Sequence, residues 1–253
     1  MLINEQIVLV TGAGRGLGAA IATAFAREGA RVVINYNRSA ETARRLADSL
    51  GDRTIALQAD VTDREAINRL VEEANQKFYG PITTIVHNAL SDFKFNGDDR
   101  QRLQSIPWTD FGAHLDVSLR GALNVMQAAA PAMSKLKFGR IINIGTNLFQ
   151  NPVVPYHDYT AAKAALLALT RTAAADLGPH GITVNMISGG LLRTTDASAA
   201  TPEAVFDFVA GLTPLGHVTT PAEFADSVLF FASPWSRAVT GQNLIVDGGL
   251  VRN

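Results

Sequence analysis

Short apolar runs rich in β-branched residues alternate along the chain with longer stretches whose apolar residues recur at helical spacing. The short runs predict strands at Ile7–Val10, Arg31–Tyr36, Thr54–Gln58, Thr84–His87, Arg140–Ile144, Thr183–Ile187 and Asn243–Asp247. The longer stretches predict helices at Leu17–Glu28, Ser39–Leu50, Asp63–Phe78, Trp108–Leu119, Gly121–Ser134, Tyr159–Leu177 and Pro221–Ala232. The last of these begins with a capping box between Thr220 and Glu223.

Strands that alternate with helices of crossover length form parallel sheets. The pattern therefore predicts an α/β fold, in which one doubly wound parallel sheet of about seven strands carries helices on both faces. Because no linker or repeat interrupts it, a single domain over residues 1–253 is expected. Two segments lie outside the pattern: residues 91–107 are polar and predict a surface excursion, and residues 188–200 are small and predict a mobile region.

Composition narrows the possible classes of protein. The chain is 47% hydrophobic, enough for a full core, and its formal net charge of −1 indicates neither a nucleic-acid nor a membrane surface. It has no cysteine, which excludes disulfides and thiolate metal sites, and no metal site is expected. No apolar run approaches the roughly 20 residues that cross a bilayer, and the start does not resemble a signal peptide. We expect a soluble cytoplasmic protein.

A glycine-rich turn follows the first strand, with the spacing Gly12-x-x-x-Gly16-x-Gly18. Glycines between a first strand and its helix let the backbone approach a pyrophosphate at the helix N-terminus. The alternative is a tight strand–helix connection without a ligand. The second strand ends without a carboxylate that would bind the 2′-hydroxyl of NAD, whereas Arg15 and Arg38 can pair with a phosphate. The sequence therefore predicts NADP(H), unless both arginines are only solvated.

Candidate chemistry centres on Tyr159 and Lys163, which are one helical turn apart and share a face. A free phenol has a pKa of about 10, and a nearby ammonium lowers it towards the working range. Thr146, at the end of the preceding strand, would bring a second hydroxyl to the same oxygen of a ligand. This arrangement suits reduction of a carbonyl or oxidation of an alcohol.

Together with the glycine spacing, Asp60-Val61, Asn88-Ala89, Tyr159-x-x-x-Lys163 and Val246-Asp247-Gly248-Gly249 resemble the short-chain dehydrogenase/reductase family over essentially the whole chain. The resemblance implies a Rossmann-type sheet and four catalytic positions, at Tyr159, Lys163, Thr146 and Ser118. It also implies a cofactor site formed by Gly12, Gly14, Arg15, Gly16, Leu17, Gly18, Asn35, Tyr36, Asn37, Arg38, Asp60, Val61, Asn88, Ala89, Tyr159, Lys163, Gly190, Leu192 and Thr194.

The chain departs from the family pattern at four positions. Leu90 replaces a glycine, Gly189 replaces a proline and is expected to loosen the loop after it, and Thr146 replaces the catalytic serine. Ser118 replaces an asparagine that the family places beside the lysine to hold a helix irregularity and a relay water.

Within the family the chain is most similar to the β-ketoacyl-(acyl-carrier-protein) reductases of fatty-acid biosynthesis. The resemblance implies NADPH-dependent reduction of a 3-oxoacyl group on acyl carrier protein. Lys135, Lys137 and Arg140 form a small basic group, which is usually only solvated; the alternative is that it docks the acidic carrier. The resemblance also implies a homotetramer, with the helices Gly121–Ser134 and Tyr159–Leu177 at one interface and the C-terminal region at another. Two alternatives remain: an oxidoreductase of another small ketone, steroid or sugar, and a nucleotide-binding regulator whose catalysis has decayed.

Overall fold

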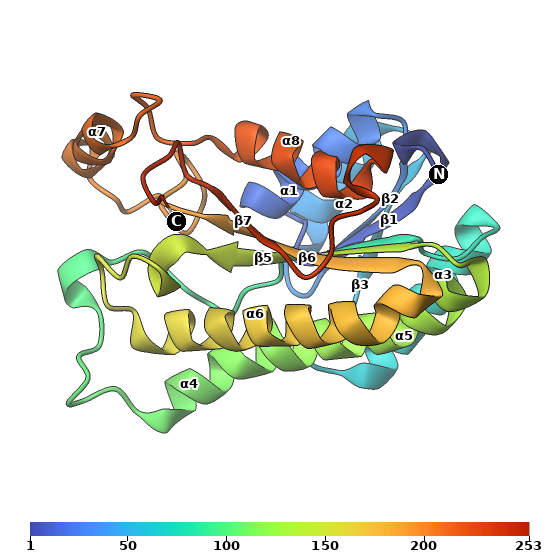
Figure 1. Cartoon of the computed structure of the whole chain (residues 1–253), viewed down its shortest axis with the longest axis horizontal. Helices are drawn as coiled ribbons and strands as arrows, with labels where there is room; N and C mark the ends of the chain where they lie inside the picture. The colour runs from blue at the N-terminus through green and yellow to red at the C-terminus, as the bar shows by residue number, and fades with distance from the viewer. Residues whose placement is uncertain (253) are drawn as a thin grey trace.

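The apolar runs form the strands of one parallel sheet in the order β3-β2-β1-β4-β5-β6-β7. Figure 1 shows this sheet between its helices in the computed structural model. The structure describes residues 1–252. The strands are β1 (Ile7–Val10), β2 (Arg31–Tyr36), β3 (Thr54–Gln58), β4 (Thr84–His87), β5 (Gly139–Thr146), β6 (Ile182–Gly189) and β7 (Asn243–Val246). The predicted doubly wound α/β sheet is therefore confirmed.

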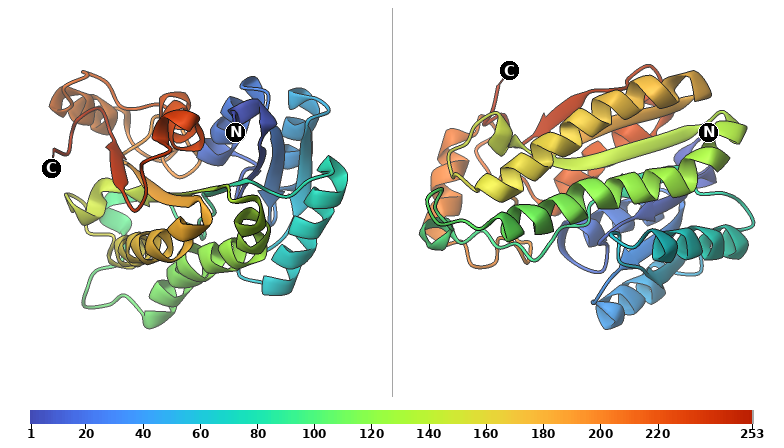
Figure 2. Two further views of the ribbon diagram at one scale, coloured as in Figure 1. Left: turned by 45° about the vertical axis from the view of Figure 1, so that its right-hand side comes forward. Right: turned by 90° about the horizontal axis from the view of Figure 1, so that it is seen from below.

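Helices cover both faces of the sheet (Figures 1 and 2). On one face lie α1 (Gly16–Arg27), α2 (Ala40–Leu50) and α8 (Pro221–Ala232), and on the other lie α3 (Arg64–Phe78), α5 (Gly121–Leu136) and α6 (His157–Leu177). Two further helices, α4 (Trp108–Leu115) and α7 (Glu203–Leu212), lie towards one end of the molecule. None of the helices in the described residues is long and apolar enough to cross a membrane.

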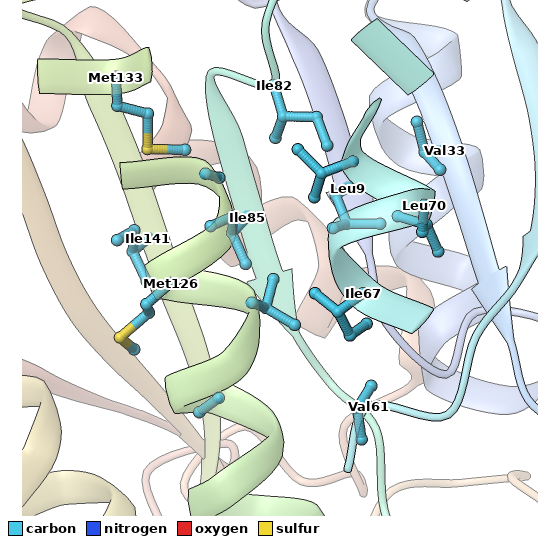
Figure 3. Close-up of a cluster of buried hydrophobic side chains, with 14 of the residues drawn as sticks. Leu9, Val33, Val61, Ile67, Leu70, Ile82, Ile85, Met126, Met133 and Ile141 are labelled. Atoms are coloured by element: carbon cyan, nitrogen blue, oxygen red, sulfur yellow. The ribbon is translucent and has the colours of Figure 1, made fainter. Parts of the chain in front are cut away.

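The core is divided into two layers by the alternation of side chains along each strand. In β1, Val8 and Val10 pack against α1 and α8, whereas Ile7 and Leu9 pack against α3 and α5. Figure 3 shows the second layer, where Leu9 lies beside Ile67 of α3. Because both faces are covered, the strands are apolar on both sides, which is why they appear in the sequence as continuous apolar runs.

The crossover between β1 and β4 determines where a ligand can bind. The chain moves outward from β1 to β2 and β3, returns to β4 on the other side of β1, and then moves outward again to β7. The connections after β1 and β4 therefore diverge and leave a crevice at the carboxyl ends of these strands. All the chemistry predicted from the sequence follows the carboxyl ends of strands in the same sheet.

Four elements near this crevice differ from the prediction. Helix α4 ends at Leu115 and is continued by a π-helical turn, Asp116–Arg120, before α5 begins. Strands β5 and β6 are longer than predicted and reach Thr146 and Gly189. Helix α7 lies in a stretch for which the sequence pattern predicts no element.

Candidate active site

A cleft of about 1440 Å³ extends along the carboxyl ends of the strands, from the glycine-rich turn to Tyr159. Most residues assigned to the cofactor line it: Gly12, Arg15, Gly16, Leu17, Gly18, Asn35, Tyr36, Asn37, Arg38, Asp60, Val61, Asn88, Ala89, Tyr159, Lys163, Gly190 and Leu192. Gly14, Ser118, Thr146 and Thr194 do not line the cleft. Four of the positions named from the sequence therefore lie outside the wall of this cleft.

The glycine-rich turn passes very close to neighbouring backbone. A Cβ on Gly18 would lie 2.4 Å from the Gly12 carbonyl oxygen, and a Cβ on Gly12 would lie 2.9 Å from the Ala89 Cα. Gly12 and Gly16 also have positive φ angles of 61° and 55°. By contrast, Ser39 Oγ, next to the start of α2, occupies the space beside Gly14. Gly14 therefore does not form part of the cleft wall.

The turn leaves the N-terminus of α1 facing the cleft, with Arg15 as its N-cap residue. The first amide groups of a helix and its dipole favour an anion at this place. The space at Gly16 is open, because a Cβ added there would lie 3.8 Å from its nearest neighbour, the Thr195 Cβ. The glycine turn therefore fits a pyrophosphate.

At the end of β2, polar side chains surround the far end of the cleft. Asn35 is buried, and its amide donates to the Ala59 carbonyl oxygen at 3.0 Å, so it braces the strand end. Asp60 receives hydrogen bonds from Asn37 and from the amide and hydroxyl of Thr62. Burial raises the pKa of the Asp60 carboxyl, but these bonds and the charge of Arg38 outweigh it, so the pKa is lowered overall.

Asn88 has a structural role that was not predicted. Its side-chain amide donates to the carbonyl oxygens of Thr11 and Gly12, both at 3.1 Å, and so holds the glycine turn against β4. The Thr11 hydroxyl in turn accepts the backbone N–H groups of Asn88 and Ala89. Asn88 was expected in the cofactor site; it does line the cleft, but its amide hydrogens are committed to the turn.

At the other end of the cleft, Tyr159 is buried, and the hydroxyl of Thr146, at the end of β5, acts on its phenol. Burial raises the pKa of Tyr159 to about 12, and the Thr146 hydroxyl opposes this shift. The Tyr159 phenol is therefore protonated at neutral pH, which suits a proton donor.

The Lys163 ammonium, which was expected to bring the pKa of Tyr159 down towards the working range, does not outweigh burial, so that pKa stays raised. The ammonium donates to the Ile144 carbonyl oxygen at 2.7 Å and lies 5.9 Å from the centre of the Tyr159 ring. At that separation, burial changes the pKa of the phenol more than the charge of the ammonium does. Burial also lowers the pKa of Lys163 to about 8, so the ammonium still carries its charge at neutral pH.

Ser118 lies in the π-helical turn and is completely buried, and its hydroxyl has no hydrogen-bond partner among residues 1–252. The turn is braced from β4 by His87, whose Nε2 lies 3.2 Å from the Val117 carbonyl oxygen. Since the Thr11 hydroxyl already accepts two N–H groups, its own hydrogen goes to His87 Nδ1, 3.2 Å away, and His87 Nε2–H donates to Val117. Burial, together with the charge of Lys163, lowers the pKa of His87 to about 3.

Several residues of the site were missed by sequence reasoning. The 91–107 segment is not a simple surface excursion, because Phe93 and Phe95 pack with Tyr156 over Tyr159. His114 and Asp158 also line the cleft there. Alternation of aromatic with polar residues after Ser91 was the one signal in the sequence that pointed to a buried face.

The connections after β4 and β6 meet over the cleft. The backbone N–H of Phe95 donates to the carbonyl oxygen of Ala197 at 2.9 Å. Nearby, Arg15 forms an exposed ion pair with Asp196 at 3.1 Å. Thr195, rather than the predicted Thr194, lines the cleft, and Thr194 has a left-handed φ of 61°.

Two further expectations need correction. Gly189 does not loosen its surroundings, because it is the last residue of β6, paired with Thr146 and Val246, and a Cβ there would lie 2.9 Å from the Phe224 ring. Arg140 is not part of a basic surface, because it is buried and its guanidinium lies over the Phe138 ring.

Comparison with known proteins gives full-length matches. The model of a family described as Enoyl-(Acyl carrier protein) reductase matches residues 12–251. A 3-oxoacyl-(acyl-carrier-protein) reductase of Synechocystis sp. is 34% identical over 98% of each chain. A (3R)-3-hydroxyacyl-CoA dehydrogenase of Canis lupus familiaris is 36% identical over 98% of this chain and 97% of its own.

A solved structure adds a ligand to the comparison. The gluconate 5-dehydrogenase of Burkholderia cenocepacia, in complex with NADP and tartrate, has a TM-score of 0.86 and is 31% identical; the match covers 97% of this chain and 94% of that one. The similarity therefore extends through the cleft and is not confined to the sheet.

Proposed function

The chain belongs to the short-chain dehydrogenase/reductase family, and on that premise we propose that it is an NADPH-dependent reductase of 3-oxoacyl groups carried by acyl carrier protein. The product is the corresponding 3-hydroxyacyl group, as in fatty-acid biosynthesis. The observation that carries the proposal is the buried contact between the Tyr159 phenol and the Thr146 hydroxyl, beside the charged Lys163.

A nicotinamide cofactor supplies this chemistry by donating a hydride to the carbonyl carbon when it is bound. The glycine turn and the N-terminus of α1 would hold its pyrophosphate. Arg38 is exposed at the end of β2 and lines the cleft, so it is available for the 2′-phosphate that distinguishes NADPH from NADH. Lys163, with its ammonium towards the end of β5, would hold the nicotinamide ribose.

Tyr159 and Thr146 would hold the substrate carbonyl oxygen between their hydroxyl groups. As the carbonyl carbon gains its new C–H bond, the phenol O–H bond breaks and the proton passes to the carbonyl oxygen, which becomes the alcohol. Tyr159 is left as a phenolate, and the positive charge of Lys163 stabilises that anion. A raised phenol pKa keeps the proton in place until the carbonyl oxygen becomes basic enough to take it.

The alternatives are less well supported. A regulator without catalysis would not need a phenol, a hydroxyl and an ammonium in one buried group. The NADP-bound relative acts, by its name, on gluconate, so a sugar substrate remains the enzyme alternative. We favour the acyl substrate because the relatives compared over almost the whole chain are named for 3-oxoacyl or 3-hydroxyacyl groups.

For partners, we propose acyl carrier protein as the substrate carrier and a homotetramer as the assembly. Lys135 and Lys137 are exposed at the end of α5 and remain candidates to meet an acidic carrier, without Arg140. Apolar side chains at possible interfaces are partly exposed: Leu123 on α5 by 41%, and Leu244 on β7 by 39%.

Tyr159→Phe tests the proposed function. The variant keeps the ring and its packing but cannot donate a proton, so we expect turnover of a 3-oxoacyl substrate to fall by at least about a hundredfold. Binding of NADPH, followed by its fluorescence, should change less than about twofold, since the phenol hydroxyl supplies only a small part of the cofactor contacts.

Tyr79→Phe is the matched control, because Tyr79 is 97% exposed and far from the cleft lining. Undiminished turnover in Tyr159→Phe would refute the assignment of the proton donor. A panel of 3-oxoacyl, sugar and steroid substrates with the unmodified protein tests the substrate class separately.

A further inference from the structure

The segment that follows β4 covers the proton donor with an aromatic ring. Phe93 stacks on Tyr159 with ring centres 4.5 Å apart and planes inclined by only 10°. Phe95 and Tyr156 complete the cluster, and Tyr159 is left 6% exposed. Since burial is what raises the pKa of Tyr159, the position of this segment controls the chemistry of the phenol.

The start of the segment is tied to the helix that carries Tyr159 by three polar side chains. Ser91 Oγ lies 2.7 Å from His114 Nδ1. His114 Nε2 lies 3.5 Å from Asp158 Oδ2 and also 3.5 Å from Ser91 Oγ, and Asp158 Oδ1 accepts the backbone N–H of Tyr159 at 2.8 Å. The chain of contacts therefore runs from the loop, through α4, to the first turn of α6.

The partners of His114 fix where its hydrogen lies. A carboxylate accepts hydrogen bonds and cannot donate them, so Nε2 carries the hydrogen that faces Asp158. Nδ1 is then the acceptor for the Ser91 hydroxyl. Burial lowers the pKa of His114, and although Asp158 opposes this shift, the imidazole is neutral at pH 7. The side chain is 7% exposed, so water does not compete for either nitrogen.

The tie acts on the aromatic cluster directly. The His114 ring meets both Phe93 and Tyr159 edge-on, at 5.5 Å and 5.9 Å between ring centres. Loss of the imidazole would free Ser91 from α6 and remove one wall of the space that holds Phe93. Further along, the segment is held by two other hydrogen bonds, from Gly97 N–H to the Tyr156 hydroxyl and from Phe95 N–H to the Ala197 carbonyl oxygen.

We propose that His114 is a positioning residue: by linking Ser91 to Asp158 it holds the 91–97 segment closed over Tyr159, so that Phe93 excludes water from the proton donor. It acts through Phe93 and does not itself touch the reacting atoms. The proposal rests on the proposed function only where turnover is concerned, because closure of the segment is a property of the protein that can be measured without substrate.

Nitration by tetranitromethane measures that closure, with peptide mapping to separate the four tyrosines. Tyr79 is 97% exposed and should react in every variant, whereas Tyr36 is 4% exposed, lies in β2 away from the segment, and reports unfolding. In the unmodified protein Tyr159 should be protected. His114→Ala should make nitration of Tyr159 roughly tenfold faster, with Tyr36 still protected, as expected for opening of one local segment.

Three further variants make the test specific. His114→Gln should restore protection, because one amide offers an acceptor to Ser91 and a donor to Asp158. Ser91→Ala should also make nitration of Tyr159 faster. If His114→Ala exposes Tyr36, and so unfolds the protein, the result with Ser91→Ala decides whether the contact between Ser91 and His114 holds the segment closed. His217→Ala is the matched control, since His217 also pairs with a carboxylate, that of Glu223 at 2.9 Å, but lies outside the cleft lining.

Kinetics give a second readout. His114→Ala should lower kcat for the ketone by roughly tenfold while KM for NADPH stays within about twofold, and His114→Gln should recover most of the loss. Protection of Tyr159 that is unchanged in both His114→Ala and Ser91→Ala would overturn the proposal, as would equal deprotection in His217→Ala. If the unmodified protein reduced no ketone, the proposed function would fail, while the nitration result would still decide the role of His114.

Discussion

Two buried ionisable residues decide the chemistry of the site. Tyr159 keeps its proton because burial raises its pKa to about 12, and Lys163 keeps its charge although burial lowers its pKa to about 8. The ammonium therefore serves mainly to stabilise the phenolate after proton transfer, since it lies 5.9 Å from the ring and is bonded to a carbonyl oxygen.

Replacement of Lys163 and of Ser118 should have very different costs. Ser118→Ala removes a hydroxyl that is unpaired within the described part of the chain, so we expect kcat to fall less than about tenfold, or ~1.4 kcal/mol. Lys163→Ala removes a buried charge beside the phenol, and kcat should fall by at least about a hundredfold. Steady-state rates with one ketone at saturating NADPH compare the two. Equal losses would show that Ser118 has a full catalytic role.

Arg38 should set the choice of cofactor. A charged hydrogen bond to phosphate is typically worth ~1.5–3 kcal/mol, so Arg38→Ala should reduce the preference for NADPH over NADH by roughly tenfold or more. Arg45→Ala is the control, because Arg45 is exposed, pairs with Glu41 and lies outside the cleft lining. Titration of both cofactors measures the preference; equal affinities in the unmodified protein would contradict the prediction.

The residues that sequence analysis found and missed differ in how their positions are fixed. Tyr159 and Lys163 share a helix face, so their spacing in the sequence already places them together. His114 meets Asp158 only because α4 packs on α6, and Phe93 reaches Tyr159 from a segment without regular structure. Contacts of that kind depend on tertiary packing, which no local pattern records.

Among the elements, α7 shows why a helix can escape prediction. Its apolar residues Val205, Phe208 and Leu212 are 40%, 67% and 52% exposed, while Phe206 is the side chain that it buries. These three residues stand at helical spacing, so the sequence did carry a helix signal that was overlooked; what the sequence does not record is that the stripe faces away from the core. The family resemblance placed a helix irregularity at Ser118, where the π-helical turn Asp116–Arg120 lies, but composition alone gave no sign of it, because the change in hydrogen bonding has no distinct composition.

The capping box of α8 was predicted and is present. Thr220 Oγ1 accepts the Glu223 N–H at 3.3 Å, and the Glu223 carboxylate accepts the Thr220 N–H at 2.8 Å. Thr220→Ala should lower the free energy of unfolding by about 1 kcal/mol, whereas Thr220→Ser, which keeps the hydroxyl, should change it much less. Urea denaturation measures both; an unaltered midpoint in Thr220→Ala would show that the box contributes nothing.

For the whole molecule, the parallel doubly wound sheet with helices on both faces was predictable, because each strand is a continuous apolar run between helices of suitable length. The packing of the connections after β4 and β6 over the cleft was not predictable, because it depends on where two segments without regular structure meet. Bounds of strands near the site were also underestimated, because β5 and β6 continue into glycine, serine and threonine residues.

Assembly is tested on the intact protein. The exposed apolar side chains on α5 and β7 favour association, and sedimentation at micromolar concentration should give about four times the mass of one chain. Leu123→Glu, at a half-exposed position of α5, should shift the distribution towards smaller species, because it would bury a charge at the proposed interface. A monomer in the unmodified protein would contradict the tetramer.

The hydrogen bond from Phe95 N–H to the Ala197 carbonyl oxygen has an evolutionary consequence. It joins the two connections over the cleft through main-chain atoms. Every amino acid except proline has the backbone N–H that this bond needs, and every amino acid has the carbonyl oxygen. Side chains other than those that hold the segment closed, such as Ser91 and Phe93, can therefore mutate while this main-chain link between the two connections persists. After gene duplication, the copies of such a protein can therefore change the ligand that they bind while the same main-chain link still encloses the cleft.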